Sequence, residues 1–440
     1  MPESENIANT RRKALRINLD PQIYGSFSEI GAGQEVAREF FQAGGASGTV
    51  AKTLSAYDMK MSDTIYGADA SGRYVSRSRL EAMLNREYSV LVKRLESTRK
   101  GNTTYFAFAD TVAAKAYKSN RDCHGWMGIR FQHHPSTEPS QIILHVRMLD
   151  ASNRDQQEAL GILGVNLIYS AFSHVSNPGY LIDSLVDDLQ WGRIEVNFIE
   201  FSGPAFSDID NRKMNLRLVT SSLGPVVMFS SDGIAQVPSE YIYKKHVLIF
   251  RGTFRPFSDI HAYMIDVGTH AFAQDLEVRS SDVVCFSEMN VARYLSEGRD
   301  EVSDLETRIS QITNRGFNAM VSSHFRYFRF SEYFAKFDEK KIGYILSVDN
   351  IRALMDEKYY DGMEGGILEA MGKLFASDSK LLVFPNLTPD GQLVTAENVE
   401  VPDSQKYFYR HLLHNRRLVP LKPDITKLVP FIASGAYFSD

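Results

Sequence analysis

The chain has 440 residues, enough for about two or three domains of ordinary size. Hydrophobic residues make up 43% and charged residues 23%, which is typical of a globular protein and excludes a disordered one. The net charge of −5 gives no strong signal for nucleic acid or for an anionic membrane surface. The only cysteines are Cys123 and Cys285, which favours a reducing compartment over a disulfide framework.

The N-terminal segment is polar and charged. Residues 1–13 lack the apolar stretch of a secretory signal, and no run of the chain reaches the roughly 18 apolar residues that a membrane-spanning helix needs. We therefore expect a cytoplasmic protein with no membrane partner, in which residues 1–20 form a flexible arm.

Helices and strands follow one another irregularly over residues 21–240. This pattern predicts an N-terminal α+β domain, and the turn Ser231-Asp-Gly233 with Pro238 predicts its end near 235–245. We expect helices at 34–41, 80–95, 158–172 and 180–189, and strands at 105–109, 128–132, 141–148, 193–201, 215–220 and 226–229.

Apolar strands and amphipathic helices alternate regularly over residues 241–420. We expect strands at 247–250, 282–286, 318–322, 342–346 and 380–384, and helices at 259–273, 301–314, 329–337, 349–357 and 364–375. This alternation predicts a doubly wound, mostly parallel C-terminal sheet domain, and residues 421–440 follow as a tail.

The loop after strand 247–250 is the strongest functional signal. Gly252-Thr253-Phe254 and Pro256 precede a helix, an order that resembles the phosphate-handling loop of nucleotidylyltransferases. In that loop glycine lets the backbone approach a phosphate, and the helix N-terminus offers unpaired N–H groups. His261 matches the second histidine of the pattern, whereas Ser258 stands at the first and Ile260 replaces the glycine between them.

The resemblance implies a role for each of these residues. Gly252, Thr253 and Arg255 would cradle phosphate, His261 would stabilise the reacting phosphorus, and Arg326 would clamp the nucleotide. Catalysis would then rest on positioning and electrostatics. The alternative is a buried strand that ends in a glycine turn, with His261 packed against its helix.

An acidic segment at 355–369 offers a second candidate. Gly365 and Gly366 begin a helix and could receive an anion, while Asp361 and Glu364 could bind Mg²⁺ together with a nucleotide. The alternative is a solvated loop that caps the helix.

A group of histidines lies near Cys123. Three ligands from Cys123, His124, His133, His134 and His145 would suit zinc, but their spacing matches no zinc signature. The alternative, which we favour, is a set of structural histidines beside a buried thiol.

Two weaker signals fall in the first half. Gly31-Ala-Gly33 precedes a helix and could cradle a phosphate. Asp110, at the end of strand 105–109, could be a catalytic carboxylate with Lys115 as a phosphate clamp, although an N-cap role is favoured.

Several stretches resemble a bacterial protein family that carries two names, nicotinate-nucleotide adenylyltransferase and TonB-dependent receptor. A receptor of that kind requires an export signal and many strands of alternating hydrophobicity, and we expect neither here. Adenylyltransferases are shorter and begin with the phosphate loop, whereas Gly252 lies far along this chain. The stretches cover most of the chain: 108–112, 123–132, 145–150, 161–166, 251–256, 356–360 and 393–398.

Taken together, these patterns predict a nucleotide- or phosphate-ligand-binding protein, nucleotidyltransferase-like if it is an enzyme. Its partner would be a nucleotide, with Mg²⁺, or a phosphorylated small molecule. The alternative is a non-catalytic subunit of a large homo-oligomer, suggested by the N-terminal arm and by the apolar tail from Leu428 to Phe438.

Overall fold

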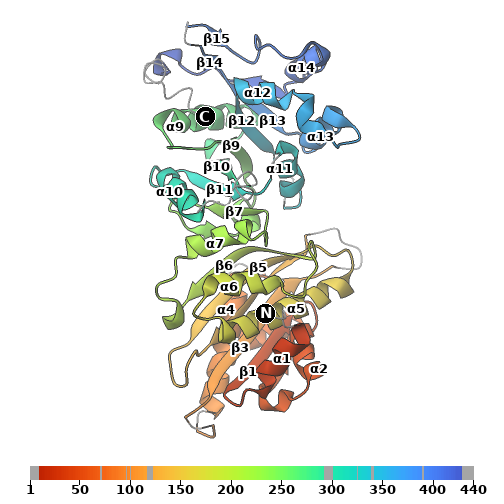
Figure 1. Cartoon of the computed structure of the whole chain (residues 1–440), viewed down its shortest axis with the longest axis vertical. Helices are drawn as coiled ribbons and strands as arrows, with labels where there is room; N and C mark the ends of the chain where they lie inside the picture. The colour runs from red at the N-terminus through yellow and green to blue at the C-terminus, as the bar shows by residue number, and fades with distance from the viewer. Residues whose placement is uncertain are drawn as a thin grey trace, which may run out of the picture. The chain divides into compact units, whose positions relative to one another are not determined.

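The computed structural model describes residues 9–69, 72–95, 97–99, 101–115, 122–291, 301–324, 326–337, 341–388 and 391–428. The chain divides into two compact units, residues 1–225 and 226–440. Both are mixed α/β structures, which confirms the predicted fold class (Figure 1). No described helix is both long enough and apolar enough to cross a bilayer.

The first unit contains one mixed sheet in the order β2-β1-β3-β4-β5-β6. β1 is parallel to β2 and β3, and the strands from β3 to β6 are antiparallel to their neighbours. The strands are β1 (Ile23–Ile30), β2 (Val50–Leu54), β3 (Thr104–Ala113), β4 (His124–Phe131), β5 (Ser140–Met148) and β6 (Ile194–Ser202).

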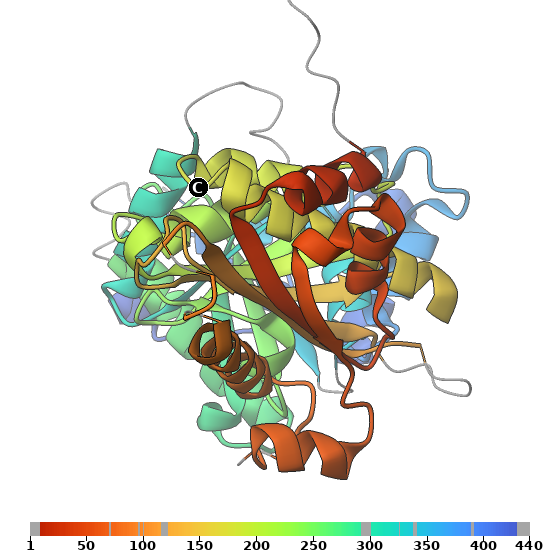
Figure 2. The same cartoon turned by 90° about the horizontal axis from the view of Figure 1, so that it is seen from below.

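Helices cover both faces of this sheet (Figure 2). On one face Phe27 and Phe106 pack against Phe40 and Phe172, which belong to α2 and α5. On the other face α4 buries Tyr88 and Leu91 against Tyr105. The helices are α1 (Thr10–Leu19), α2 (Glu35–Ala43), α3 (Met59–Tyr66), α4 (Arg77–Leu95), α5 (Asn153–Ser173), α6 (Pro178–Asp183) and α7 (Asn211–Thr220).

Two expectations for the first unit need correction. Residues 10–19 of the expected flexible arm form α1, which buries Ala14 and Ile17 and whose Lys13 Nζ donates to Asn166 Oδ1 at 2.8 Å. The predicted strand 215–220 lies within helix α7, which begins at the N-cap Asp210.

Asparagines of α7 cover the outer edge of β6. The side-chain amide of Asn215 accepts from the Ile199 N–H at 3.1 Å and donates to the Ile199 carbonyl at 2.7 Å. Asn211, one turn earlier, makes the same pair of bonds to Phe201 at 2.8 and 3.0 Å. Because exposed strand edges invite pairing with other chains, α7 protects this edge.

The second unit contains a sheet in the order β16-β13-β12-β9-β10-β11-β7-β8. It begins at Val226 because β7 pairs with β11, a few residues before the boundary expected near 235–245. The sheet is parallel from β16 to β11, as predicted. Its strands are β7 (Val226–Phe229), β8 (Ala235–Gln236), β9 (His246–Arg251), β10 (Val283–Asn290), β11 (Asn318–Ser322), β12 (Ile342–Ser347), β13 (Lys380–Phe384) and β16 (Leu418–Pro420).

The strand order of this sheet reverses at β9. The chain runs from β9 outward to β10 and β11, then returns to the other side of β9 and continues through β12, β13 and β16. This is the order of a doubly wound dinucleotide-binding fold, in which ligands bind beyond the carboxyl ends of the strands at the point of reversal.

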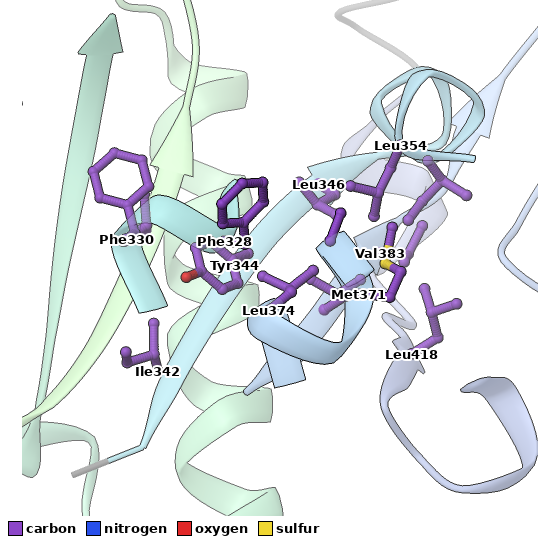
Figure 3. Close-up of a cluster of buried hydrophobic side chains, with 14 of the residues drawn as sticks. Phe328, Phe330, Ile342, Tyr344, Leu346, Leu354, Met371, Leu374, Val383 and Leu418 are labelled. Carbon is purple, nitrogen blue, oxygen red and sulfur yellow. The ribbon is translucent and has the colours of Figure 1, made fainter. Parts of the chain in front are cut away.

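Helices flank the second sheet, with α9 and α10 on one side and α11 and α13 on the other (Figure 1). On the latter side Phe328, Leu354, Met371 and Leu374 pack against Tyr344 and the neighbouring strand residues (Figure 3). The helices are α8 (Pro238–Tyr241), α9 (Asp259–Asp275), α10 (Glu301–Thr313), α11 (Tyr327–Phe334), α12 (Val348–Leu354), α13 (Gly366–Phe375) and α14 (Lys406–His414), and a separate hairpin joins β14 (Asn386–Leu387) to β15 (Leu393–Val394).

Candidate functional site

A cavity of about 600 Å³ lies at the carboxyl ends of the second sheet. Its lining comes from the segments that follow β9, β10, β11, β12 and β13, so it lies where the strand order reverses. The volume is within the roughly 300–1,000 Å³ of small-molecule sites. Of the residues predicted from the sequence, Gly252, Thr253, His261 and Arg326 line it, whereas Arg255, Gly365 and Gly366 do not.

Arg251, the last residue of β9, joins three strand ends at the floor of the cavity. Its Nε lies 2.6 Å from Glu288 Oε2 on β10, and its Nη2 donates to the His324 carbonyl beyond β11 at 2.6 Å. The guanidinium also lies over the ring of Tyr327, 4.9 Å from its centroid. Ser322 donates to the other oxygen of Glu288 at 2.6 Å. The positive charge of Arg251 is therefore balanced by a buried carboxylate.

The Gly252 loop is filled by its own residues. The Gly252 N–H donates to the Glu288 carbonyl at 3.1 Å, so it is not directed at a ligand. The fully buried ring of Phe254 covers Gly252, and a Cβ there would lie 2.8 Å from that ring. Phe254 adopts a positive φ of 51°. Glycine is thus required here for the packing of Phe254.

Two arginines beside this loop, Arg255 and Arg308, are held by one carboxylate. Arg255 lies 2.7 Å from Asp304 of α10, on the exposed side of the loop. Arg308 reaches Asp304 at 2.6 Å and donates to the Thr253 carbonyl at 2.9 Å, and its side chain is almost fully buried. Arg308 therefore supports the loop from beneath and contributes to the cavity wall.

His261 belongs to the cap of α9. Its Nδ1 accepts from the backbone N–H of Ser258 at 2.9 Å and lies 2.8 Å from the Ser258 hydroxyl. The ring stacks on Phe257, with 5.5 Å between centroids. Because Nδ1 accepts a backbone N–H, it carries no proton, and the neutral ring holds its proton on Nε2.

Arg326 is the N-cap residue of α11 and lines the cavity. Within the described part of the chain its side chain forms no ion pair and no hydrogen bond. Burial raises the pKa of Tyr360, and the nearby Arg326 guanidinium opposes that rise. Arg326 is thus the cavity arginine whose charge no described carboxylate balances.

Gly365 and Gly366 begin α13, away from the cavity. The Gly365 N–H donates to Glu369 Oε2 at 3.1 Å, and Glu369 also pairs with Lys373 at 2.7 Å. The start of α13 is therefore capped by Glu369, a side chain of its own next turn. This agrees with the alternative interpretation of this segment, a loop that caps the helix.

Several cavity residues were not predicted from the sequence. Asn290, Ser347, Asn350 and Asn386 end or follow parallel strands, and a search for polar residues at strand ends would have found them. Arg308 lies in mid-helix, where no sequence pattern distinguishes it. The Oδ1 of Asn386 is buried and has no hydrogen-bond partner within the described residues.

Two histidines of the first unit, His124 and His145, form a chain of hydrogen bonds with Asn197. His124 Nδ1 lies 3.1 Å from His145 Nε2, and His145 Nδ1 lies 2.7 Å from Asn197 Oδ1. Burial lowers the pKa of His145 to about 3. No group of three or more His, Cys, Asp or Glu side chains placed to hold a metal ion occurs among the described residues.

A carboxylate occupies the place where Gly31 and Gly33 would have held a phosphate. The two oxygens of Glu29 accept from the N–H groups of Val36 and Ala37 in the first turn of α2, both at 3.0 Å. Asp110 is the register partner of Glu29 within β3, so it is a buried strand residue and no N-cap. Burial raises the pKa of both carboxyls, that of Glu29 to about 7.

No protein-family model matches the chain, and no curated protein matches it. Among solved structures, it is similar to the competence/damage inducible protein CihA from Agrobacterium tumefaciens, with 18% identity, 37% of this chain and 94% of that chain covered, and a TM-score of 0.26. It is also similar to a competence or damage-inducible protein from Enterobacter asburiae, with 10% identity and a TM-score of 0.28. That match covers 38% of this chain and 98% of the other. At these values the activity has to be inferred from the site itself.

Proposed function

We propose that the second unit binds a nucleotide or a related phosphorylated small molecule in the cavity between the ends of β9 and β12. The observation that carries this proposal is the position of the cavity at the reversal of strand order, where doubly wound folds hold their ligands. Its volume is sufficient for a ligand of that size.

Arg326 is the proposed anion contact. A guanidinium forms strong, charge-assisted hydrogen bonds to phosphate oxygens, and the other two cavity arginines already have carboxylate partners. In this proposal Arg326 performs the phosphate-binding role that the sequence pattern assigned jointly to Arg326 and the Gly252 loop.

The proposal is limited to binding. Adenylyl transfer would use His261 to stabilise a negatively charged transition state, and a neutral imidazole that caps α9 supplies a hydrogen bond without positive charge. The Gly252 N–H is also already bonded. These contacts favour a ligand-binding unit over a nucleotidyltransferase.

Isothermal titration of the full chain with ATP and with nicotinamide mononucleotide tests the proposal. We expect binding heat with at least one of them, and the variant Arg326→Gln to weaken that binding by about 10- to 100-fold. Arg329→Gln is the matched control, because Arg329 lies on the same helix, is exposed and pairs with Glu332. No heat with either ligand at millimolar concentration would refute the proposal.

A further inference from the structure

We infer that the cavity selects a ligand with one phosphate group on a largely apolar or aromatic body, of the nucleoside monophosphate class, and discriminates against triphosphates. This inference rests on the proposed function and specifies its ligand.

Three arginines line the cavity, and two of them already have carboxylate partners. Arg251 is paired with Glu288, whose side chain is fully buried, so its charge is compensated within the protein. Arg308 is paired with Asp304, a carboxylate that it shares with Arg255 on the exposed side of the loop. Arg326 is the one arginine of the described lining that has no carboxylate partner among the described residues.

The features that hold a triphosphate are missing from the described lining. Nucleoside triphosphate sites use a lysine and a carboxylate-bound Mg²⁺ to offset the phosphate charges. No described lining residue is a lysine. The one acidic residue of the described lining, Asp349, pairs with Arg352 at the exposed rim. A second and third phosphate would therefore add charge without gaining a cation.

The rest of the wall suits an apolar body. It continues the buried core of α11, α12 and α13, since residues such as Phe328, Leu354 and Met371 belong to both the core and the cavity (Figure 3). An aromatic base placed there would be removed from water, which contributes roughly 25 cal/mol for each Å² of apolar surface buried. The apolar lining includes Ile260, Met264, Phe328, Leu354, Met371 and Leu374.

Asn386 adds a polar contact beside this apolar wall. Its Oδ1 is buried without a partner in the described part of the chain, and a buried acceptor left unpaired is unfavourable. A rotation of the Asn386 side chain toward the cavity would bring this oxygen to a donor group on the ligand, such as an exocyclic amine or a ribose hydroxyl. The ligand is thus expected to carry such a donor as well as its phosphate.

Titration calorimetry of the full chain with adenosine, AMP, ADP and ATP, the last two with and without Mg²⁺, tests this inference. We expect AMP to bind about tenfold or more tighter than adenosine, since one charge-assisted contact is added. ADP and ATP should bind no tighter than AMP. Arg326→Gln should remove the difference between AMP and adenosine and leave adenosine affinity unchanged, whereas Arg329→Gln should change neither.

The outcomes separate this inference from the proposed function. Binding of ATP with Mg²⁺ about tenfold or more tighter than AMP would overturn the single-phosphate inference and leave nucleotide binding intact. An AMP-to-adenosine ratio that Arg326→Gln does not alter would also overturn it. Absence of binding by all four ligands would overturn the proposed function as well.

Discussion

Arg251 and Glu288 are register partners on adjacent parallel strands, and their side chains meet at 2.6 Å beneath the candidate site. The pair fixes the ends of β9 and β10, and through the His324 carbonyl it also fixes the segment that leads to Arg326. The pair therefore contributes to the position of Arg326, the proposed anion contact.

Breaking this pair should destabilise the second unit strongly. Arg251→Met leaves the Glu288 carboxylate buried without its counter-charge, which typically costs about 3–5 kcal/mol of unfolding free energy. The double variant Arg251→Met/Glu288→Gln should recover part of that loss. Urea unfolding measures both, with the exposed Arg352→Met as a control that costs about 0–1 kcal/mol. Equal losses in the single and double variants would contradict the pairing.

Removing the amide that covers β6 should destabilise the first unit. Asn215→Ala leaves the N–H and the carbonyl of Ile199 unpaired at a buried position, at a cost of about 1–3 kcal/mol for each group. The exposed edge should also promote self-association, which light scattering detects. Arg212→Ala on the same helix is the control, because its side chain is partly exposed. A loss for Asn215→Ala no larger than for the control would refute the role of this side chain.

The buried carboxyl of Glu29 should make the first unit less stable as the pH rises. Burial raises its pKa from the ordinary 4.5 to about 7, so the native state holds the proton more tightly than the unfolded state does. The stabilisation is complete below about pH 4.5 and is lost as the pH rises through about 7. The glutamine of Glu29→Gln cannot titrate. The variant should therefore have a lower free energy of unfolding than the natural chain at pH 5, and this difference should shrink by pH 7.5 in urea unfolding. A deficit that grows with pH would contradict this sign.

His145 should have the opposite dependence on pH. Burial lowers its pKa from 6.5 to about 3, so the unfolded state takes up the proton first. Its contribution is complete above about pH 6.5 and is lost as the pH falls, by about 1.4 kcal/mol per pH unit. His145→Gln should therefore lose less stability at pH 4.5 than at pH 7.5. Glu29 is present in both proteins, so the difference in unfolding free energy between the natural chain and His145→Gln reports on His145. A difference that stays constant with pH would argue against a neutral buried imidazole.

Much of the fold of the second unit could be predicted, because parallel strands that are buried on both faces appear as short apolar runs between helices. The runs that became β9 to β13 were identified on this basis. The order of the strands was not predictable, since the direction of each crossover depends on packing between helices and sheet. The position of the cavity at the reversal of order therefore needed the structure.

The error at residues 215–220 has a local cause. Val219 and Thr220 are β-branched and favour a strand, but they end a helix that begins at Asp210. The asparagines one turn apart, Asn211 and Asn215, carried the decisive signal, because both must face β6 to cover its edge. Such a tertiary contact is invisible to local periodicity.

The candidate site was only partly predictable. The turn after β9 follows from Gly252 and the helix that begins after Ser258, but the ring of Phe254 and the carbonyl of Glu288, which fill that turn, come from packing. Arg326 was expected to clamp a nucleotide from its resemblance alone, and the structure adds that it lines the cavity. That role is still a prediction.

A crystal structure of the full chain with AMP tests the central claim most directly. We expect the phosphate within hydrogen-bond distance of the Arg326 guanidinium and the adenine against the apolar wall that includes Met371 and Leu374. Nucleotide bound elsewhere on the chain, or a cavity that stays without AMP at saturating concentration, would contradict it.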